Sequence, residues 1–133
     1  MYGYVVGLPA FLAYFGIGLV LLVLFSALYS LVTPQREFSL IKEGNCAAAT
    51  AFLGGLFGFG LPLASAAANS VSIVDFVIWA AIGALIQLLA FGMAALVQRN
   101  LATRITQGEM SAGLWAGGIA LVVGLLNAAC MTY

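Results

Sequence analysis

Residues 40–66, LIKEGNCAAATAFLGGLFGFGLPLASA, decide the fold. Two charged residues and an asparagine are followed at once by more than twenty residues that carry no charge and are rich in alanine and glycine. Most of this pattern returns at residues 104–130, RITQGEMSAGLWAGGIALVVGLLNAAC. An apolar run of this length without a polar face is typical of a helix that spans a lipid bilayer.

Charged residues are scarce throughout the chain. Of the 133 residues, 65% are apolar and only 6% are charged, whereas soluble domains carry about 25% charged residues. No charge occurs in residues 1–35, 44–74, 76–98 or 110–133. Each interval can cross a hydrocarbon core of about 30 Å as a helix, at about 1.5 Å per residue. The sequence therefore predicts an all-α integral membrane protein with four transmembrane helices.

The returning pattern predicts two copies of one unit. A shift of 64 residues gives seven identities in 26 ungapped positions, where about two or three are expected from such a composition. Because each unit would cross the membrane twice, both copies enter from the same side, and we expect a pseudo-twofold axis along the membrane normal. We place a first two-helix repeat at 1–66, with helices at about 5–32 and 46–67, and a second at 67–133, with helices at about 73–97 and 110–131.

The small residues predict how the helices pack. Lipid supplies no hydrophobic drive between helices, so small side chains let the backbones approach closely. The second predicted helix carries Thr50, Gly54 and Gly58 at intervals of four. The last helix and its approach carry Gly108, Ala112, Ala116, Ala120, Gly124 and Ala128. We expect these two helices to pack against each other along these ridges, with a homo-oligomer interface or a narrow pore lining as the alternatives.

The basic residues predict the orientation. All four lie in two connections, Arg36 and Lys42 between the first two helices and Arg99 and Arg104 between the last two. Short loops rich in lysine and arginine stay in the cytoplasm. We therefore expect both termini outside and both basic loops in the cytoplasm.

The first basic connection has a pattern of its own. Thr33 suits the N-cap position and Pro34 the first position of a helix. Residues 34–45 then form a short amphipathic segment at the lipid headgroups, with Phe38 and Ile41 facing inward. A plain solvated linker is an equally weighted alternative.

The few polar residues in or near the predicted helices form the candidate site: Asp75, Gln87, Asn127, Asn69 and Ser65. Ser72 and Asp75 resemble a capping box, which favours a capping role for the carboxylate. The rival role is binding of a cation or proton in a water-filled vestibule. Gln87, near the bilayer midplane, is expected to form a hydrogen bond between helices rather than to bind a solute.

The remaining three candidates lie toward the outer side. Asn127 is placed at a depth where Ser65, Asn69 and Asp75 can meet it. Pro62 frees the carbonyl of Gly58 and favours a kink in the second helix. The arrangement suits either an outward-facing polar pocket or, more simply, the ordinary polarity of helix ends.

Several kinds of chemistry are excluded by composition. The chain has no histidine, which removes histidine metal sites, proton relays and triads that use histidine as the base. Cys46 and Cys130 are expected at opposite faces of the membrane, too far apart for a disulfide. No glycine-rich phosphate loop is present. We therefore expect no metal site, no cofactor, no enzyme activity and no nucleic-acid partner.

At this point a family resemblance is visible. The segments TPQREFSLIKEGNCAAATAFLGG, FGLPLASAAANSVS and GLLNAACMT resemble the YjfL family of small bacterial inner-membrane proteins, which are built from two copies of a two-helix domain of unknown function. The resemblance implies an inner-membrane location and four helices, so the termini that the basic loops place outside would face the periplasm. It also implies genes beside relatives of a phage-shock membrane-remodelling protein and of ATP-grasp ligases. That neighbourhood associates the family with envelope stress.

The two copies differ at one point of the resemblance. Gln107-Gly108-Glu109 replaces Glu43-Gly44-Asn45, so a role of the asparagine cannot be transferred to the second copy. Glu43 and Glu109 each precede a helix, where a negative charge is stabilised. Their expected partners are Lys42, Arg104 or another protein.

Three functions compete. The first is a non-enzymatic membrane subunit or anchor whose basic loops hold another envelope protein. The second is an oligomeric small channel or transporter that uses Asp75, Gln87 and Asn127, although four helices enclose little room by themselves. The third is binding of lipid headgroups by the four basic side chains. Membrane lipid, further copies of the chain and another envelope protein are the expected partners.

Overall fold

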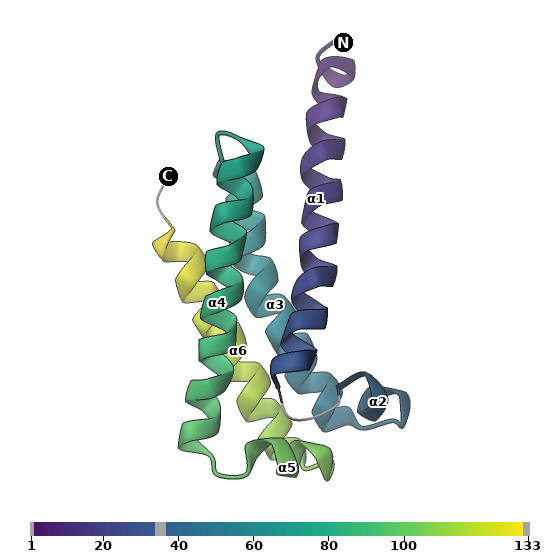
Figure 1. The fold of residues 1–133 in the computed structure, drawn as a ribbon, viewed down its shortest axis with the longest axis vertical. Helices are drawn as coiled ribbons and strands as arrows, with labels where there is room; N and C mark the ends of the chain where they lie inside the picture. The colour runs from purple at the N-terminus through teal and green to yellow at the C-terminus, as the bar shows by residue number, and fades with distance from the viewer. Residues whose placement is uncertain (1, 34–36, 132–133) are drawn as a thin grey trace.

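The computed structural model describes residues 2–33 and 37–131, and the side chains of these residues from residue 7 onward. Four long helices, α1 (Tyr2–Val32), α3 (Cys46–Asn69), α4 (Ile73–Val97) and α6 (Met110–Cys130), form a bundle. Two short helices, α2 (Glu37–Lys42) and α5 (Leu101–Thr106), both lie at the end of the bundle opposite the termini (Figure 1). The four long helices are long and apolar enough to cross a membrane, so the predicted fold class is confirmed.

Helices α3 and α6 make the most extensive contact in the bundle. A Cβ atom at Gly54 would lie 2.2 Å from the Cα atom of Gly117, and one at Gly113 would lie 2.4 Å from the carbonyl oxygen of Ala47. No larger residue fits where two backbones meet at such distances. Glycine therefore sets the crossing of α3 and α6, as expected for helices that associate within lipid.

The predicted ridges coincide with this contact only in part. Thr50, Gly54 and Gly58 of α3 lie against α6, as do Ala120 and Gly124 of α6 against α3. Ala112 and Ala116 are buried, and Ala128 is half-buried.

The predicted ridge of small residues is wrong at Gly108 and omits two glycines of α6. Gly108 lies before α6, in the turn after α5, and a Cβ atom there would meet nothing within 4 Å. Gly113 and Gly117, which the predicted ridge omits, also meet the α3 backbone: a Cβ atom there would lie 2.4 and 2.6 Å from it, compared with 2.1 Å at the predicted Gly124.

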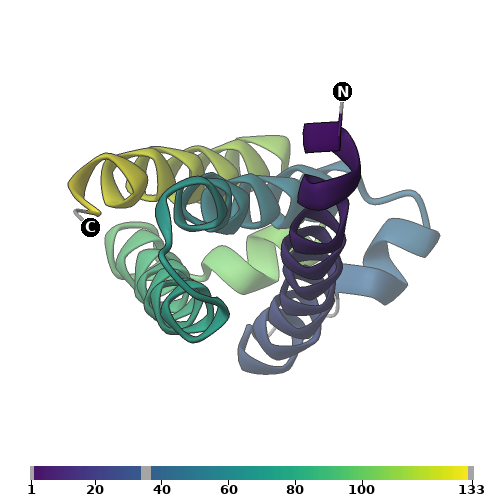
Figure 2. The same cartoon turned by 90° about the horizontal axis from the view of Figure 1, so that it is seen from above.

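The other two long helices are held unequally. Helix α4 packs on both α3 and α6, whereas α1 contacts α3 and α4 and stands apart along much of its length (Figures 1 and 2). Its anchors are aromatic. The ring of Phe25 stacks on Phe59 with centroids 4.3 Å apart, and Tyr29 packs against Phe52 and Phe91.

The turns that follow α2 and α5 have the same backbone. In each, the N–H of a glycine (Gly44 or Gly108) donates to the carbonyl three residues earlier, at 3.0 and 2.9 Å. The next residue (Asn45 or Glu109) donates to the carbonyl five residues earlier, at 2.9 and 3.0 Å. This is the Schellman ending of a helix, which needs a positive φ at the glycine; the two values are +89° and +80°.

The short helices also follow the 64-residue shift. Helix α2 spans residues 37–42 and α5 spans 101–106, and the next helices begin at 46 and 110. The packing, however, differs between the copies. Gly54 and Gly58 face α6, while their counterparts Gly118 and Val122 face away from the bundle. The pseudo-twofold axis therefore stays a prediction.

The first connection differs from its prediction. Thr33 ends α1, because its N–H donates to the carbonyl of Tyr29 at 2.9 Å, and Pro34 lies outside the described residues. The described helix begins at Glu37, and its existence favours the amphipathic segment over a plain linker. Its buried side chains are Glu37 and Leu40. Phe38 is 53% exposed and rests edge-on against Phe52, and Ile41 is half-buried.

Candidate functional site

Asp75 caps helix α4. Its N–H donates to Ser72 Oγ at 3.1 Å, and its Oδ2 accepts from the N–H of Val71 at 3.2 Å. This reciprocal pattern satisfies two backbone donors that the start of a helix leaves free, and the carboxylate gains from the helix dipole. The local geometry thus gives Asp75 a structural role as the cap of α4.

Gln87 joins three helices in the middle of the bundle. It lies on α4, is fully buried, and its Nε2 donates to the carbonyl of Ala120 on α6 at 3.0 Å. A Cβ atom at Gly58 of α3 would lie 2.6 Å from the Gln87 amide. The small residue on α3 therefore makes the space for this amide, which stands where a hydrogen bond between helices was expected.

Asn127, Asn69 and Ser65 do not converge. The Asn69 amide donates to the carbonyl of Ser65 at 2.8 Å, within α3. The Asn127 Nδ2 atom is buried beside Gly83 and has no hydrogen-bond partner in the described part of the chain. No hydrogen bond among the described residues joins these side chains to Asp75. The expected polar pocket is thus not assembled by direct contacts.

Pro62 contributes to the contact between α3 and α6. Helix α3 continues through this proline, which leaves the carbonyl of Gly58 without its usual donor. A Cβ atom at Gly124 would lie 2.1 Å from that carbonyl oxygen. The Cα–H group of Gly124 therefore points at the freed carbonyl, a weak hydrogen bond of the kind common between helices in close contact.

The end of the bundle that carries α2, α5 and the two turns after them is called the floor below. Asn45, in the first turn, links the two halves of the floor. Its Nδ2 donates to the carbonyls of Ile105 and Thr106 on α5, at 2.9 and 3.1 Å. Its Oδ1 accepts from the N–H of Ala48 at 3.0 Å and so caps α3. The sequence pattern pointed to the start of a helix but not to the link with α5.

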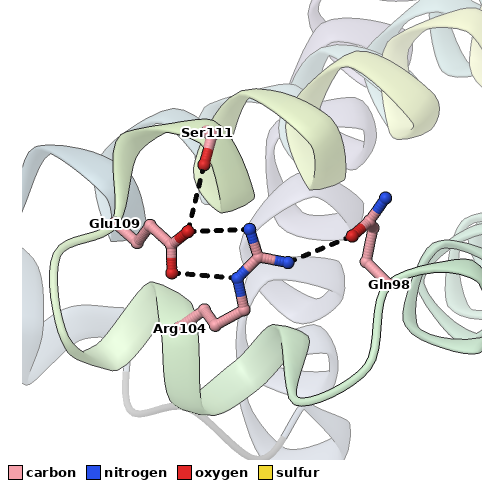
Figure 3. Close-up of polar contacts among 4 residues, drawn as sticks. All are labelled: Gln98, Arg104, Glu109 and Ser111. Atoms are coloured by element: carbon pink, nitrogen blue, oxygen red, sulfur yellow. Dashed lines mark hydrogen bonds and ion pairs between the residues drawn. The ribbon is translucent and has the colours of Figure 1, made fainter.

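The second turn is held by an ion pair (Figure 3). Arg104 donates to both carboxylate oxygens of Glu109, at 2.9 and 2.7 Å, and to Gln98 Oε1 at 3.1 Å. The Ser111 hydroxyl donates to the same carboxylate at 3.3 Å. The hydrogen bonds from Arg104 lower the pKa of Glu109. The guanidinium of Arg104 is thus already bound by other residues of this chain.

The other three predicted loop charges differ from Arg104. Lys42 and Arg99 are exposed at the floor, and neither forms a salt bridge within the described ranges. Arg36 lies outside the described residues. Two cations of the described floor are therefore free to meet another molecule.

A buried acid is the feature that sequence reasoning missed. Glu37, at the start of α2, is fully buried. Its Oε1 lies against the hydroxyl of Thr33, and its Oε2 has no hydrogen-bond partner among the residues described. Burial raises the pKa of this carboxyl. The sequence showed only that Glu37 lies in a polar connection with basic residues, and nothing there indicated that its side chain is buried.

The rest of the described surface carries no metal-binding cluster. Residues 2–33 and 37–131 contain no group of three potential metal ligands, and Cys46 and Cys130 are free and exposed. A groove of about 600 Å³ between α1, α3 and α4 is lined largely by apolar side chains, among them Phe11, Leu63 and Phe76. Such a lining suits lipid rather than an ion.

Comparison with known proteins places the chain in a family. The family model described as a domain of unknown function, DUF350, matches residues 3–131. The chain belongs to this family. It is 45% identical over 126 residues to the UPF0719 inner membrane protein YjfL of Escherichia coli strain K12, covering 95% of this chain and 96% of that protein. The YjfL protein of Escherichia coli O157:H7 matches with the same figures.

No solved structure matches the chain. With its four apolar helices and these relatives, it is a multi-pass protein of the inner membrane whose biochemical activity is not known. The family resemblance expected from the sequence is confirmed.

Proposed function

We propose that this protein is a non-enzymatic membrane subunit whose floor holds a soluble partner at the cytoplasmic face. The proposal rests on one observation: side-chain hydrogen bonds link the separate segments of the floor to one another. Asn45 ties the first turn to α5, and Arg104 ties the second turn to Gln98 and Glu109. Connections that only join helices need no such links.

The charges of the floor suit recognition of a partner. Lys42 and Arg99 are exposed beside the linked turns, together with Glu43 and Gln107. Exposed charges around a rigid surface steer a partner and fix its register more than they add affinity. Their basic character also favours the cytoplasm as the side on which this surface lies.

The interior of the bundle supports a subunit over a channel. The three polar residues that a channel would use already have other tasks or neighbours: Asp75 caps α4, Gln87 binds α6, and Asn127 lies against the α3–α4 contact. Between α3 and α6 the backbones are in direct contact. A pathway for ions would have to run between copies of the chain, and this is the channel alternative that the experiment below must exclude.

The experiment is crosslinking in living cells with a photoreactive amino acid. It is placed at Glu43 or Gln107, which are exposed on the floor, and, as a control, at Leu126, which is 64% exposed on α6. We expect both floor positions to crosslink to the same soluble protein and Leu126 to crosslink to none. The double charge reversal Lys42→Glu with Arg99→Glu should abolish the crosslink while the membrane level of the protein stays normal.

Two outcomes would contradict the proposal. One is crosslinking only between copies of this chain at all three positions, together with ion flux in liposomes that contain the purified protein. The other is a floor crosslink that survives the double charge reversal. The first outcome would establish the channel, and the second would remove the floor charges from recognition.

A further inference from the structure

The buried acid Glu37 stands in an arrangement that its charged form does not satisfy. The hydroxyl oxygen of Thr33 lies 2.9 Å from the carbonyl oxygen of Tyr29 and also within hydrogen-bond distance of Glu37 Oε1. Thr33 itself is 4% exposed and Glu37 is 0% exposed. Water therefore does not replace either contact.

Counting protons decides which form of the acid fits. A threonine hydroxyl has one proton to donate, and a carbonyl oxygen can only accept. If Thr33 donates to Tyr29, the contact between Thr33 and Glu37 needs a proton from the acid. With an ionised Glu37, one of the two contacts would bring together two oxygens with no proton between them. Both contacts are satisfied when the Oε1–H group of Glu37 donates to Thr33.

Among the described residues, no cation forms an ion pair with Glu37. Helix α1 presents only hydroxyl groups, those of Tyr29, Ser30 and Thr33. At the far end of α2, Lys42 is exposed, and in α5 the guanidinium of Arg104 is bound to Glu109.

The other described titratable groups of the neighbouring elements form no ion pair with the acid either. Glu43, Cys46 and Arg99 are exposed, and no salt bridge of the described residues involves Glu37. An unpaired carboxylate in such a place is costly, and neutralisation is the usual outcome. Burial is the largest influence on the pKa of Glu37, and it raises that pKa.

We propose that Glu37 is a proton-binding site that locks α2 to the end of α1. The ligand is a proton, held between the carboxyl of Glu37 and the hydroxyl of Thr33. When the acid loses this proton, its charge requires water, and the start of α2 leaves its place beside Thr33. The lock is complete at low pH and is lost as the pH rises through the pKa of the bound acid. The inference does not depend on the proposed function.

Infrared spectroscopy of the full chain in lipid nanodiscs tests the site directly, because a protonated carboxyl absorbs separately from a carboxylate. The chain has only four acidic residues, so assignment by single variants is practical. At neutral pH we expect one protonated-carboxyl band, which Glu37→Gln removes and Glu43→Gln and Asp75→Asn leave in place. Absence of the band, or its survival in Glu37→Gln, would overturn the proposal.

A second measurement follows the lock itself. Spin labels placed on α1 and α2 should report one short distance at pH about 5 and a broader, longer distribution at pH about 9, with the Glu37→Gln variant locked throughout. If the distance between the labels on α1 and α2 does not change with pH in the native chain, the proposed lock is contradicted, even if Glu37 binds a proton. Arg36, outside the described residues, supplies the remaining control. If Arg36→Gln creates a protonated-carboxyl band that the native protein lacks, Glu37 is ion-paired and the proposal fails.

Discussion

The turn after α2 and the turn after α5 have the same backbone and different side-chain contacts. Both end a six-residue helix with a glycine at positive φ and the same pair of hydrogen bonds. In the first turn Asn45 reaches across to α5. In the second turn Glu109 stays within its own copy, bound to Arg104.

The comparison shows that the backbone of each turn depends on local sequence, whereas the side-chain contacts depend on tertiary packing. A Schellman turn is determined by a glycine and the hydrogen bonds of its own helix, so both turns have it. A side-chain link between the two halves of the floor needs a donor from only one of them. The first turn supplies that donor with the Asn45 amide, and the second turn has a local ion pair at the matching position.

The largest expected difference between equivalent positions concerns helix packing. Gly54→Ala places a Cβ atom 2.2 Å from the Gly117 Cα atom, and we expect a loss of about 1–3 kcal/mol in the free energy of unfolding. The counterpart Gly118→Ala meets nothing within 4 Å and should be neutral or stabilising by up to about 1 kcal/mol, because alanine is the better helix former. Unfolding by SDS in mixed micelles measures both. Equal losses in the two variants would contradict the packing described.

Side-chain links come next. Asn45→Ala removes the cap of α3 and both bonds to α5, and we expect a loss of about 2 kcal/mol. Glu109→Ala should cost clearly less, because its ion pair is exposed and weakened by solvent. The same unfolding assay compares them. A larger loss at Glu109 would show that the ion pair, not the amide, holds the floor together.

The shared backbone predicts equal effects. Gly44→Ala and Gly108→Ala each force a residue with a Cβ atom into the left-handed region, at a cost of about 1 kcal/mol. Neither position has a neighbour within 4 Å of the added atom, so the strain is purely conformational. Thermal denaturation in detergent should therefore give equal shifts for the two variants. A difference of twofold or more would mean that the turns are not equivalent.

The smallest effect concerns pH. The bonds from Arg104 lower the pKa of Glu109, so the pair contributes stability at neutral pH that is lost as the pH falls through the pKa of the folded form. Glu37 has a raised pKa and acts in the opposite sense, losing its contribution as the pH rises. Melting temperatures across pH should show that Glu109→Gln removes a loss of stability on lowering the pH, whereas Glu37→Gln removes a loss of stability on raising the pH. The opposite assignment would contradict both pKa directions.

Much of the fold was predictable from charge and hydropathy. Four long charge-free intervals gave the four long helices, because a helix in lipid must be continuous and apolar. The pairing of α3 with α6 also followed from their small residues. The face of α6 that contacts α3 followed only in part: Ala120 and Gly124 were predicted, and Gly113 and Gly117 were not. Ala112 and Ala116 stand next to Gly113 and Gly117 in the sequence, and two parallel ridges of small residues look alike until a neighbouring helix selects one.

The site was less predictable for a similar reason. The helix start at Asp75 is a local pattern and could be read directly. The burial of Glu37 depends on how α2 packs on α3 and places the acid beside Thr33, and the bonds of Asn45 depend on where α5 lies. Neither placement has a signal in the sequence around the residue, so the acid and the amide appeared as ordinary polar residues of a loop.

Native mass spectrometry of the protein, in lipid nanodiscs made directly from its own membranes, tests the central claim that this is a packed subunit with a working floor. We predict one or two copies of the chain with a second, soluble protein attached, and loss of that protein in the Lys42→Glu and Arg99→Glu double variant. A closed ring of several identical chains with nothing else bound would contradict the claim and would point to a channel.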